Sequence, residues 1–318
     1  NFTNYVLKNF PNSNPKKIYS DLEELLHTEE IVINKNYEKL IIPKNLKIFK
    51  FKLGDSYFSI NYEDFKIVNT IIGQLFHLKY EANVKSINYY VFELNGRYFL
   101  NDDDKIIGSW NDKEIHYLTG KLLSLIMCDF HKVEENKWSG FLHASAVSKD
   151  GNAIVIVGES GSGKSTSCAI LSKNDYNLLA DDTTPISRDG KVGNFPNSIS
   201  IKEPSFQKIN NLFLKANISD TIIISKGKIK YLNPHGLKSF NPITMNCSTI
   251  VRIKYNPKKQ NSLKKAKSKD LLSLIVNESF FPTNLKSVDG FMNWFINCKC
   301  YTLTYNNDKS LINSFKEL

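Results

Sequence analysis

The sequence predicts an α/β fold in which a phosphate-binding loop joins a buried strand to a helix, preceded by a separate α+β region. Residues 153–157 form an apolar run that leads directly into a G-x-x-x-x-G-K-S pattern, which is typical of a P-loop. Residues 46–60 and 87–100 instead alternate apolar and polar side chains, each around a glycine-containing turn, as β-hairpins do. We therefore expect an N-terminal α+β domain over residues 1–112 and a P-loop nucleotide-binding domain over residues 113–318.

The elements of the N-terminal domain are predicted from turn residues and periodicity. Gly54 follows one alternating segment and Asn95-Gly96 interrupts another, so each pair of flanking strands should form a hairpin. Helical spacing predicts a helix over residues 65–78 between the hairpins and another over residues 18–27. The acidic run at residues 101–104 is expected to be a solvated loop. This domain is the candidate for binding the molecule that would react with the nucleotide.

The second domain is predicted to begin with a helix over residues 117–130, which leads into a strand that carries His143. After the P-loop we expect a helix over residues 166–173 and a strand over residues 178–180. Further along, hairpins are predicted around Asp189-Gly190 and Lys226-Gly227, and a strand over residues 249–255.

The P-loop residues each have a mechanical reason to be there. Glycines allow positive φ angles, so consecutive backbone N–H groups can turn toward phosphate oxygens. Lys164 should reach the β- and γ-phosphates, and the Ser165 hydroxyl should bind Mg²⁺. The helix that follows directs its positive dipole end at the same anion. The residues expected to contact the nucleotide are Gly158, Glu159, Ser160, Gly161, Ser162, Gly163, Lys164, Ser165 and Thr166.

Two adjacent carboxylates, Asp181 and Asp182, end the strand after the P-loop helix. A strand–loop–helix–strand unit would direct them at the crevice where the phosphates lie. One of them could bind Mg²⁺ while the other accepts a proton from an attacking hydroxyl. The alternative is that the pair forms a solvated turn or caps a helix.

Several segments together resemble one family. Leu142-His-Ala-Ser-Ala-Val147, the turn at Lys149-Asp-Gly151, the P-loop and Leu178-Leu-Ala-Asp-Asp182 are similar to the core of HPr kinase/phosphorylase and the HPr-kinase-related kinases. ATP-dependent phosphoenolpyruvate carboxykinase shares this phosphate-binding core. Asn197-Ser-Ile-Ser-Ile-Lys-Glu-Pro204 is also similar to a strand that passes the nucleotide site in these proteins. The resemblance covers residues 115–255, with a weaker likeness in the helix at 269–279.

The resemblance implies roles for individual residues. Lys164 and Ser165 would bind phosphate and Mg²⁺, Asp181 would be the catalytic base, and Asp182 would be the metal carboxylate. His143 matches the family's histidine beside the acidic pair, although a lone histidine near a strand is often structural. Related phosphotransferases place a basic group near the transferred phosphate, and Arg252 is the candidate here, with an ordinary surface position as the alternative.

The resemblance predicts an ATP- and Mg²⁺-dependent kinase that phosphorylates a hydroxyl of a peptide, a protein or a small molecule. The Glu-Ile-Arg-Gly-Leu-Gly signature of the bifunctional HPr enzymes is absent, and the nearest segment is Ile201-Lys-Glu-Pro204. This departure argues against HPr as the acceptor. The chain has only three arginines, Arg97, Arg188 and Arg252, which argues against a carboxykinase-like lyase. An ATP-binding regulatory or scaffold protein remains the alternative from another class.

Composition sets further limits. The chain has 318 residues, 41% of them hydrophobic, and no apolar stretch long enough for a bilayer, so we expect a cytoplasmic enzyme without a membrane partner. Its five cysteines do not form a disulfide pattern, and Cys298 and Cys300, expected on one strand, do not complete a zinc site. The net charge of +10 is concentrated at residues 258–269, where a solvated loop is a better interpretation than nucleic-acid binding. The sequence does not decide whether the chain forms a homo-oligomer.

Overall fold

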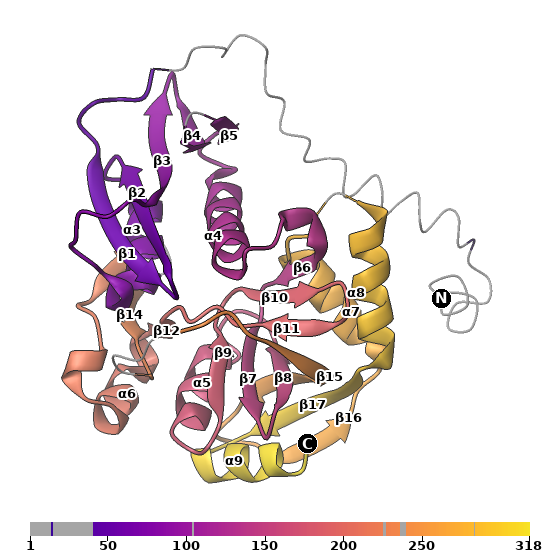
Figure 1. Ribbon diagram of the computed structural model, residues 1–318. Helices are drawn as coiled ribbons and strands as arrows, with labels where there is room; N and C mark the ends of the chain where they lie inside the picture. Colours follow the sequence, from indigo (N-terminus) through magenta and orange to yellow (C-terminus); the bar gives the residue numbers. More distant parts are fainter. Residues whose placement is uncertain (1–13, 15–40, 104, 225–226, 236–239, 283) are drawn as a thin grey trace.

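The computed structural model describes residue 14 and residues 41–318, apart from residues 104, 225–226, 236–239 and 283. The helix predicted at residues 18–27 lies outside the described residues. The chain forms a mixed α/β structure with a five-stranded, a nine-stranded and a three-stranded sheet (Figure 1). The two larger sheets correspond to the two predicted regions of the sequence.

The five-stranded sheet is the N-terminal one, in the order β1-β2-β3-β4-β5. Its strands are β1 (Lys47–Leu53), β2 (Ser56–Tyr62), β3 (Ile87–Leu94), β4 (Arg97–Asp102) and β5 (Lys105–Trp110). Both predicted hairpins are confirmed: β1 pairs antiparallel with β2, and β3 with β4. Asn95 and Gly96 adopt φ angles of 54° and 75°, the left-handed conformation that a tight hairpin turn requires.

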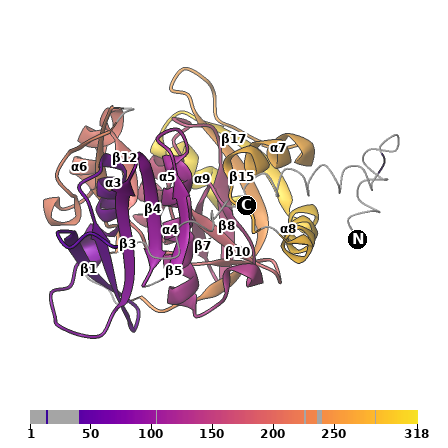
Figure 2. The same ribbon diagram turned by 90° about the horizontal axis from the view of Figure 1, so that it is seen from above.

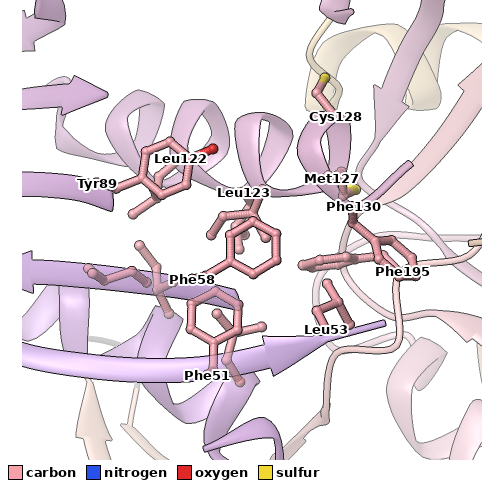
Figure 3. Packing of buried hydrophobic residues seen from close by; sticks show 14 of the residues in the cluster. Phe51, Leu53, Phe58, Tyr89, Leu122, Leu123, Met127, Cys128, Phe130 and Phe195 are labelled. Atoms are coloured by element: carbon pink, nitrogen blue, oxygen red, sulfur yellow. The ribbon is translucent and has the colours of Figure 1, made fainter. Parts of the chain in front are cut away.

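Two helices cover one face of this sheet. Helix α3 (Lys66–Leu75) connects β2 to β3, which are parallel, and α4 (Ile115–His131) follows β5. Their apolar residues pack with the inward side chains of β1–β3 in one hydrophobic cluster, part of which is shown in Figure 3. Phe195 from the second half of the chain belongs to the same cluster and lies beside Met127 and Phe130 of α4 (Figure 3). The hydrophobic core therefore continues across the predicted domain boundary.

The boundary near residue 112 stays a prediction, but the packing of α4 bears on it. This helix begins at Ile115, and its buried side chains contact the N-terminal sheet and α3. We infer that α4 belongs structurally with the preceding strands, because its apolar face is covered by them.

The nine-stranded sheet has the order β6-β10-β11-β15-β8-β7-β9, and β17 also pairs with β15 and with β16. Its strands are β6 (Trp138–Leu142), β7 (Ser145–Lys149), β8 (Asn152–Val157), β9 (Asn177–Ala180), β10 (Thr184–Ser187), β11 (Lys191–Gly193), β15 (Thr244–Tyr255), β16 (Ser262–Lys265) and β17 (Lys299–Tyr305). Strand β15 is parallel to both β8 and β17, whereas β7 is antiparallel to β8 and β9. The predicted hairpin around Asp189-Gly190 is confirmed as β10–β11.

Helices cover both faces of this sheet (Figures 1 and 2). On one face α5 (Lys164–Ser172) and α9 (Asp308–Lys316) share a hydrophobic cluster with Ile154 and Ile156 of β8. On the other face α7 (Ser268–Glu278) and α8 (Leu285–Asn297) share a second cluster with Val155, which points the opposite way in the same strand. A strand that is apolar on both faces is thus explained by helices on both sides.

The small sheet joins the two halves. It consists of β12 (Ile199–Lys202), β14 (Gly227–Leu232) and β13 (Ile222–Ile224), and α6 (Phe206–Leu212) precedes β13. Helix α3 lies against it so closely that a Cβ on Gly73 would come within 2.1 Å of the Tyr231 ring. Glycine inside a helix is usually unfavourable, so this close approach explains its presence.

Some local expectations are corrected. His143 lies in a bend between β6 and β7 and not within a strand, and the predicted lysine-rich loop contains β16. Cys298 ends α8, so only Cys300 belongs to β17. Strand β5 was not predicted, because its mixed sequence after the acidic run has no clear alternation. Over the described residues, no helix combines the length and apolarity needed to span a membrane.

Candidate active site

The P-loop leaves the end of β8 and closes onto the first turn of α5. Gly158, Gly161 and Gly163 have φ angles of 153°, 84° and 101°, which favour glycine over other residues. A Cβ on Gly158 would lie 2.6 Å from Ser162 Oγ and 2.9 Å from Ile253 O. The sequence therefore needs glycine at this position for a steric reason as well as a conformational one.

Neighbouring strands fix the loop in place. The backbone N–H of Tyr255 donates to the carbonyl of Ser162 over 3.0 Å, and Lys164, which is largely buried, donates from Nζ to the carbonyl of Gly158. The hydroxyls of Ser167 and Tyr305 lie 2.9 Å apart and tie α5 to β17. The loop is consequently a preformed feature of the fold and keeps the lysine beside its own backbone.

The loop and the acidic pair share one edge of the sheet. Strands β8, β15 and β17 run parallel, and β9 runs in the same direction because β7 lies antiparallel between β8 and β9. Their carboxyl ends therefore meet at one edge, where ligands bind in open α/β sheets. The structure brings Asp181 and Ser165 together at this edge, where the Ser165 hydroxyl lies close enough to lower the pKa of the Asp181 carboxyl.

Asp181 is completely buried, and two donors bind its carboxylate oxygens. The Ser145 hydroxyl donates to Oδ1 over 2.6 Å, and the backbone N–H of Ser200 donates to Oδ2 over 3.1 Å. Burial, followed by repulsion from Asp182, raises the pKa of Asp181 to about 6, although the hydrogen bonds oppose the shift. A carboxylate with a raised pKa and fixed orientation is typical of a functional site.

Asp182 is oriented differently from its neighbour. Its φ angle is 67°, and the N–H of Thr183 donates back to the carbonyl of Asp181 over 2.8 Å, so the chain reverses tightly here. An aspartate tolerates this left-handed conformation better than most other residues do. The Asp182 side chain is 41% exposed, and its Oδ1 lies 3.4 Å from Nδ1 of His143. The turn thus buries one carboxylate and leaves the other accessible beside a histidine.

The segment at residues 194–200 supports the acidic pair and was only partly anticipated. Asn197 exchanges two hydrogen bonds with the backbone of Asp181, of 3.2 and 2.7 Å, and Ser200 binds its carboxylate. At the end of β12, Lys202 Nζ donates to Ser160 Oγ in the P-loop over 2.9 Å. The sequence resemblance includes residues 197–204 but implies no role for any single residue among them. Serine and asparagine are too common to stand out in a sequence.

Arg252 lies at the same edge but on the far side of the P-loop from β9. Its guanidinium forms an ion pair with Glu159, the second residue of the loop. Thr166, the last predicted contact, shares a 3.0 Å hydrogen bond with Ser205. The arginine is therefore positioned to hold the loop, and it is not among the groups hydrogen-bonded to the acidic pair.

The side chains around Ser165 suit a magnesium ion that is held partly by water and phosphate. They do not form a site in which protein side chains alone bind the metal. Among the described residues, no group of three His, Cys, Asp or Glu side chains could hold a metal by itself. Mg²⁺ commonly uses one or two carboxylates together with water and substrate phosphates. The Ser165 hydroxyl and the Asp181 carboxylate supply such a pair of oxygen ligands next to the phosphate-binding loop.

Comparison with known proteins gives little further information. No protein-family model matches the sequence, and no curated protein matches it either. Among solved structures, the chain is similar to the HPr(Ser) kinase/phosphatase from Coxiella burnetii, with 12% sequence identity and a TM-score of 0.25. The match covers 54% of this chain and 90% of that one. A TM-score this low does not show that the two proteins share a fold. The function proposed for this chain therefore depends on its own residues.

Proposed function

We propose that this protein is an ATP- and Mg²⁺-dependent kinase that transfers the γ-phosphoryl group to a hydroxyl. The observation that carries this proposal is the arrangement at one sheet edge. A glycine-rich loop with Lys164 lies next to the buried Asp181, and the accessible Asp182 faces His143. Phosphoryl transfer depends on holding the triphosphate, neutralising its charge and orienting the acceptor, and these residues can divide those tasks.

The loop holds the phosphates. Its backbone N–H groups and the start of α5 provide donors and a positive dipole end. When the nucleotide binds, Lys164 exchanges its hydrogen bond to the Gly158 carbonyl for contacts with phosphate oxygens. The charged lysine then pairs with a negative group in place of a neutral carbonyl, which is the stronger interaction. Lys202, already at Ser160, adds a second cation to the same loop.

The two aspartates take different roles. Ser165 and Asp181 would hold Mg²⁺, which would offset the negative charge of the phosphates. Asp182 accepts the proton of the acceptor hydroxyl, because its side chain is 41% exposed and can meet an incoming acceptor, whereas Asp181 is buried beside Ser165. His143 orients Asp182. Burial thus favours the reverse of the assignment that the resemblance implied.

The acceptor class follows from the resemblance to HPr-kinase-related kinases and from the missing HPr signature. A serine or threonine of a peptide or protein, or a small hydroxylated molecule, is the proposed acceptor. An ATP-binding regulatory protein would use the same loop, but it would have no need for the carboxylate pair with His143.

A two-part assay tests the proposal. Calorimetry measures Mg·ATP binding, and mass spectrometry follows phosphate incorporation into a panel of Ser- and Thr-containing peptides and hydroxylated small molecules. Lys164→Ala is expected to lower transfer about 100- to 1000-fold, because one charge-stabilising donor is lost. Lys173→Ala, at the exposed far end of α5, is the matched control and should behave as the wild type. Tight ATP binding by the wild type without modification of any panel member would favour the regulatory protein.

A further inference from the structure

Tyr255 is an exposed aromatic residue fixed directly against the P-loop. It is the last residue of β15, and 46% of its surface is exposed. Its backbone N–H donates to Ser162, and its Cβ lies 3.5 Å from the position of a Cβ on Gly163. The tyrosine is thus held beside the first turn of α5 by main-chain contacts.

The ring itself is supported from one side. Its centroid lies 5.3 Å from that of Tyr305, with an angle of 50° between the rings. Tyr305 is buried and bonded through its hydroxyl to Ser167 of α5, so it is a rigid base for its neighbour. An exposed ring on a rigid support loses little conformational freedom when a flat ligand stacks on it.

The position of the acidic pair fixes the direction of a bound nucleotide. Asp181 and Asp182 follow β9, which lies on one side of β8, whereas β15 lies on the other side (Figure 1). The transferred phosphate belongs next to the carboxylates, and we take the rest of the molecule to extend along the loop away from them, toward β15 and β17. The exposed aromatic ring at that end is Tyr255.

We propose that Tyr255 is the platform on which the purine base of the nucleotide stacks. This inference rests on the proposed function and adds the position of the nucleoside to it. Stacking engages the flat face of a base and does not read its edge, so Tyr255 should favour purine nucleotides over bare polyphosphates without separating ATP from GTP.

The test compares ligands that share a phosphate chain. Calorimetry is performed on the full chain with Mg·ATP, Mg·GTP and Mg·tripolyphosphate. Tyr255→Ala should weaken ATP and GTP about tenfold and leave tripolyphosphate unchanged, because only the nucleotides have a base to stack. Tyr255→Phe should bind all three ligands as the wild type does. Tyr117→Ala removes a similarly exposed tyrosine from α4 and is the matched control.

The outcomes separate this inference from the function on which it rests. Unchanged ATP affinity in Tyr255→Ala would overturn it. Equal weakening of all three ligands would also overturn it, because Tyr255 would then support the loop and not the base. If the wild type bound tripolyphosphate as tightly as ATP and GTP, the phosphate site would be supported, but stacking of the base on Tyr255 would be ruled out. Failure of the wild type to bind any of the three would remove the phosphate site itself.

Discussion

The P-loop and the acidic pair lie at the same edge of the nine-stranded sheet, but different parts of the chain hold them in place. The loop and its lysine belong to one continuous segment, which is supported by the ends of β15 and β17 and by one contact from Lys202 of β12 to Ser160. The acidic pair is held by Ser145 from one direction and by residues 194–200 from another.

Residues 194–200 connect the acidic pair to the N-terminal sheet. His77, at the end of α3, donates from Nε2 to the carbonyl of Pro196 and accepts from the Ser198 hydroxyl at Nδ1. His131 of α4 contacts the carbonyl of Asn194 over 2.8 Å. Phe195 inserts into the N-terminal core, and its N–H donates to Leu179 in β9 (Figure 3).

This difference shows that the P-loop and the acidic pair, although they form one site, are held mainly by different segments of the chain. Changes in the N-terminal half should disturb the acidic pair through residues 194–200 and leave the P-loop intact. Phosphoryl transfer and ATP binding should therefore respond differently to such changes, and four predictions test this separation.

The largest effect is expected when the two carboxylates are changed separately. Asp182→Asn should lower transfer about 100- to 10,000-fold with Mg·ATP affinity unchanged, because the proton acceptor is lost. Asp181→Asn should instead raise the Mg²⁺ concentration needed for activity, because an amide is a weaker ligand for this ion. Magnesium titrations of the kinase assay distinguish the two, and Asp189→Asn in the β10–β11 turn is the control. The opposite pair of phenotypes would restore Asp181 as the base.

A second prediction concerns the residue that inserts into the N-terminal core. Phe195→Ala should destabilise the fold by about 3–5 kcal/mol, because it leaves a cavity in a fully buried position. It should also lower transfer at temperatures where the protein remains folded, because residues 194–200 would shift. Phe295→Ala, in the equally buried core under α8, should cost similar stability and leave transfer unchanged. Denaturant unfolding and the kinase assay measure the two effects, and equal transfer rates would contradict the link.

The raised pKa of Asp181 predicts a pH-dependent loss of stability. Between pH 3.8 and about 6 the folded protein retains a proton on Asp181 that the unfolded chain has released. Stability should therefore fall as the pH rises through this window, by about 3 kcal/mol for a shift of this size. Urea unfolding of the wild type and of Asp181→Asn at several pH values isolates this contribution as their difference. If the difference in unfolding free energy between the two proteins does not vary between pH 4 and pH 7, the pKa of Asp181 is not raised.

The smallest effect is expected at the histidine that connects α3 to this segment. Burial lowers the pKa of His77 to about 4, so it is neutral at physiological pH and can accept the Ser198 hydrogen bond. His77→Ala removes two hydrogen bonds to residues 196–198 and should lower kcat about fivefold, because the segment that supports Asp181 is held less firmly. The KM for ATP should stay constant, since the P-loop is untouched. His116→Ala on α4 is the control, and a change in KM alone would indicate that His77 acts on the loop.

Several features were predicted correctly because their geometry is local. The hairpins β1–β2, β3–β4 and β10–β11 were identified from turn residues such as Asn95-Gly96, whose backbone conformation few other residues adopt. The strand–loop–helix around Lys164 was identified in the same way, since its glycines, lysine and serine occupy fixed positions within eight residues. Strands β5 and β16 were missed, because partly exposed strands with charged residues carry little periodicity.

The sequence by itself determined that a P-loop follows a buried strand and that two carboxylates end the strand after its helix. Only the tertiary structure decided that Asp181 is buried and Asp182 exposed, that Asn197 and Ser200 hold the first of them, and that the N-terminal core reaches this site through Phe195. The physical reason is the range of the interactions involved. Turn conformation depends on a few adjacent residues, whereas burial and hydrogen bonding depend on which distant segments meet.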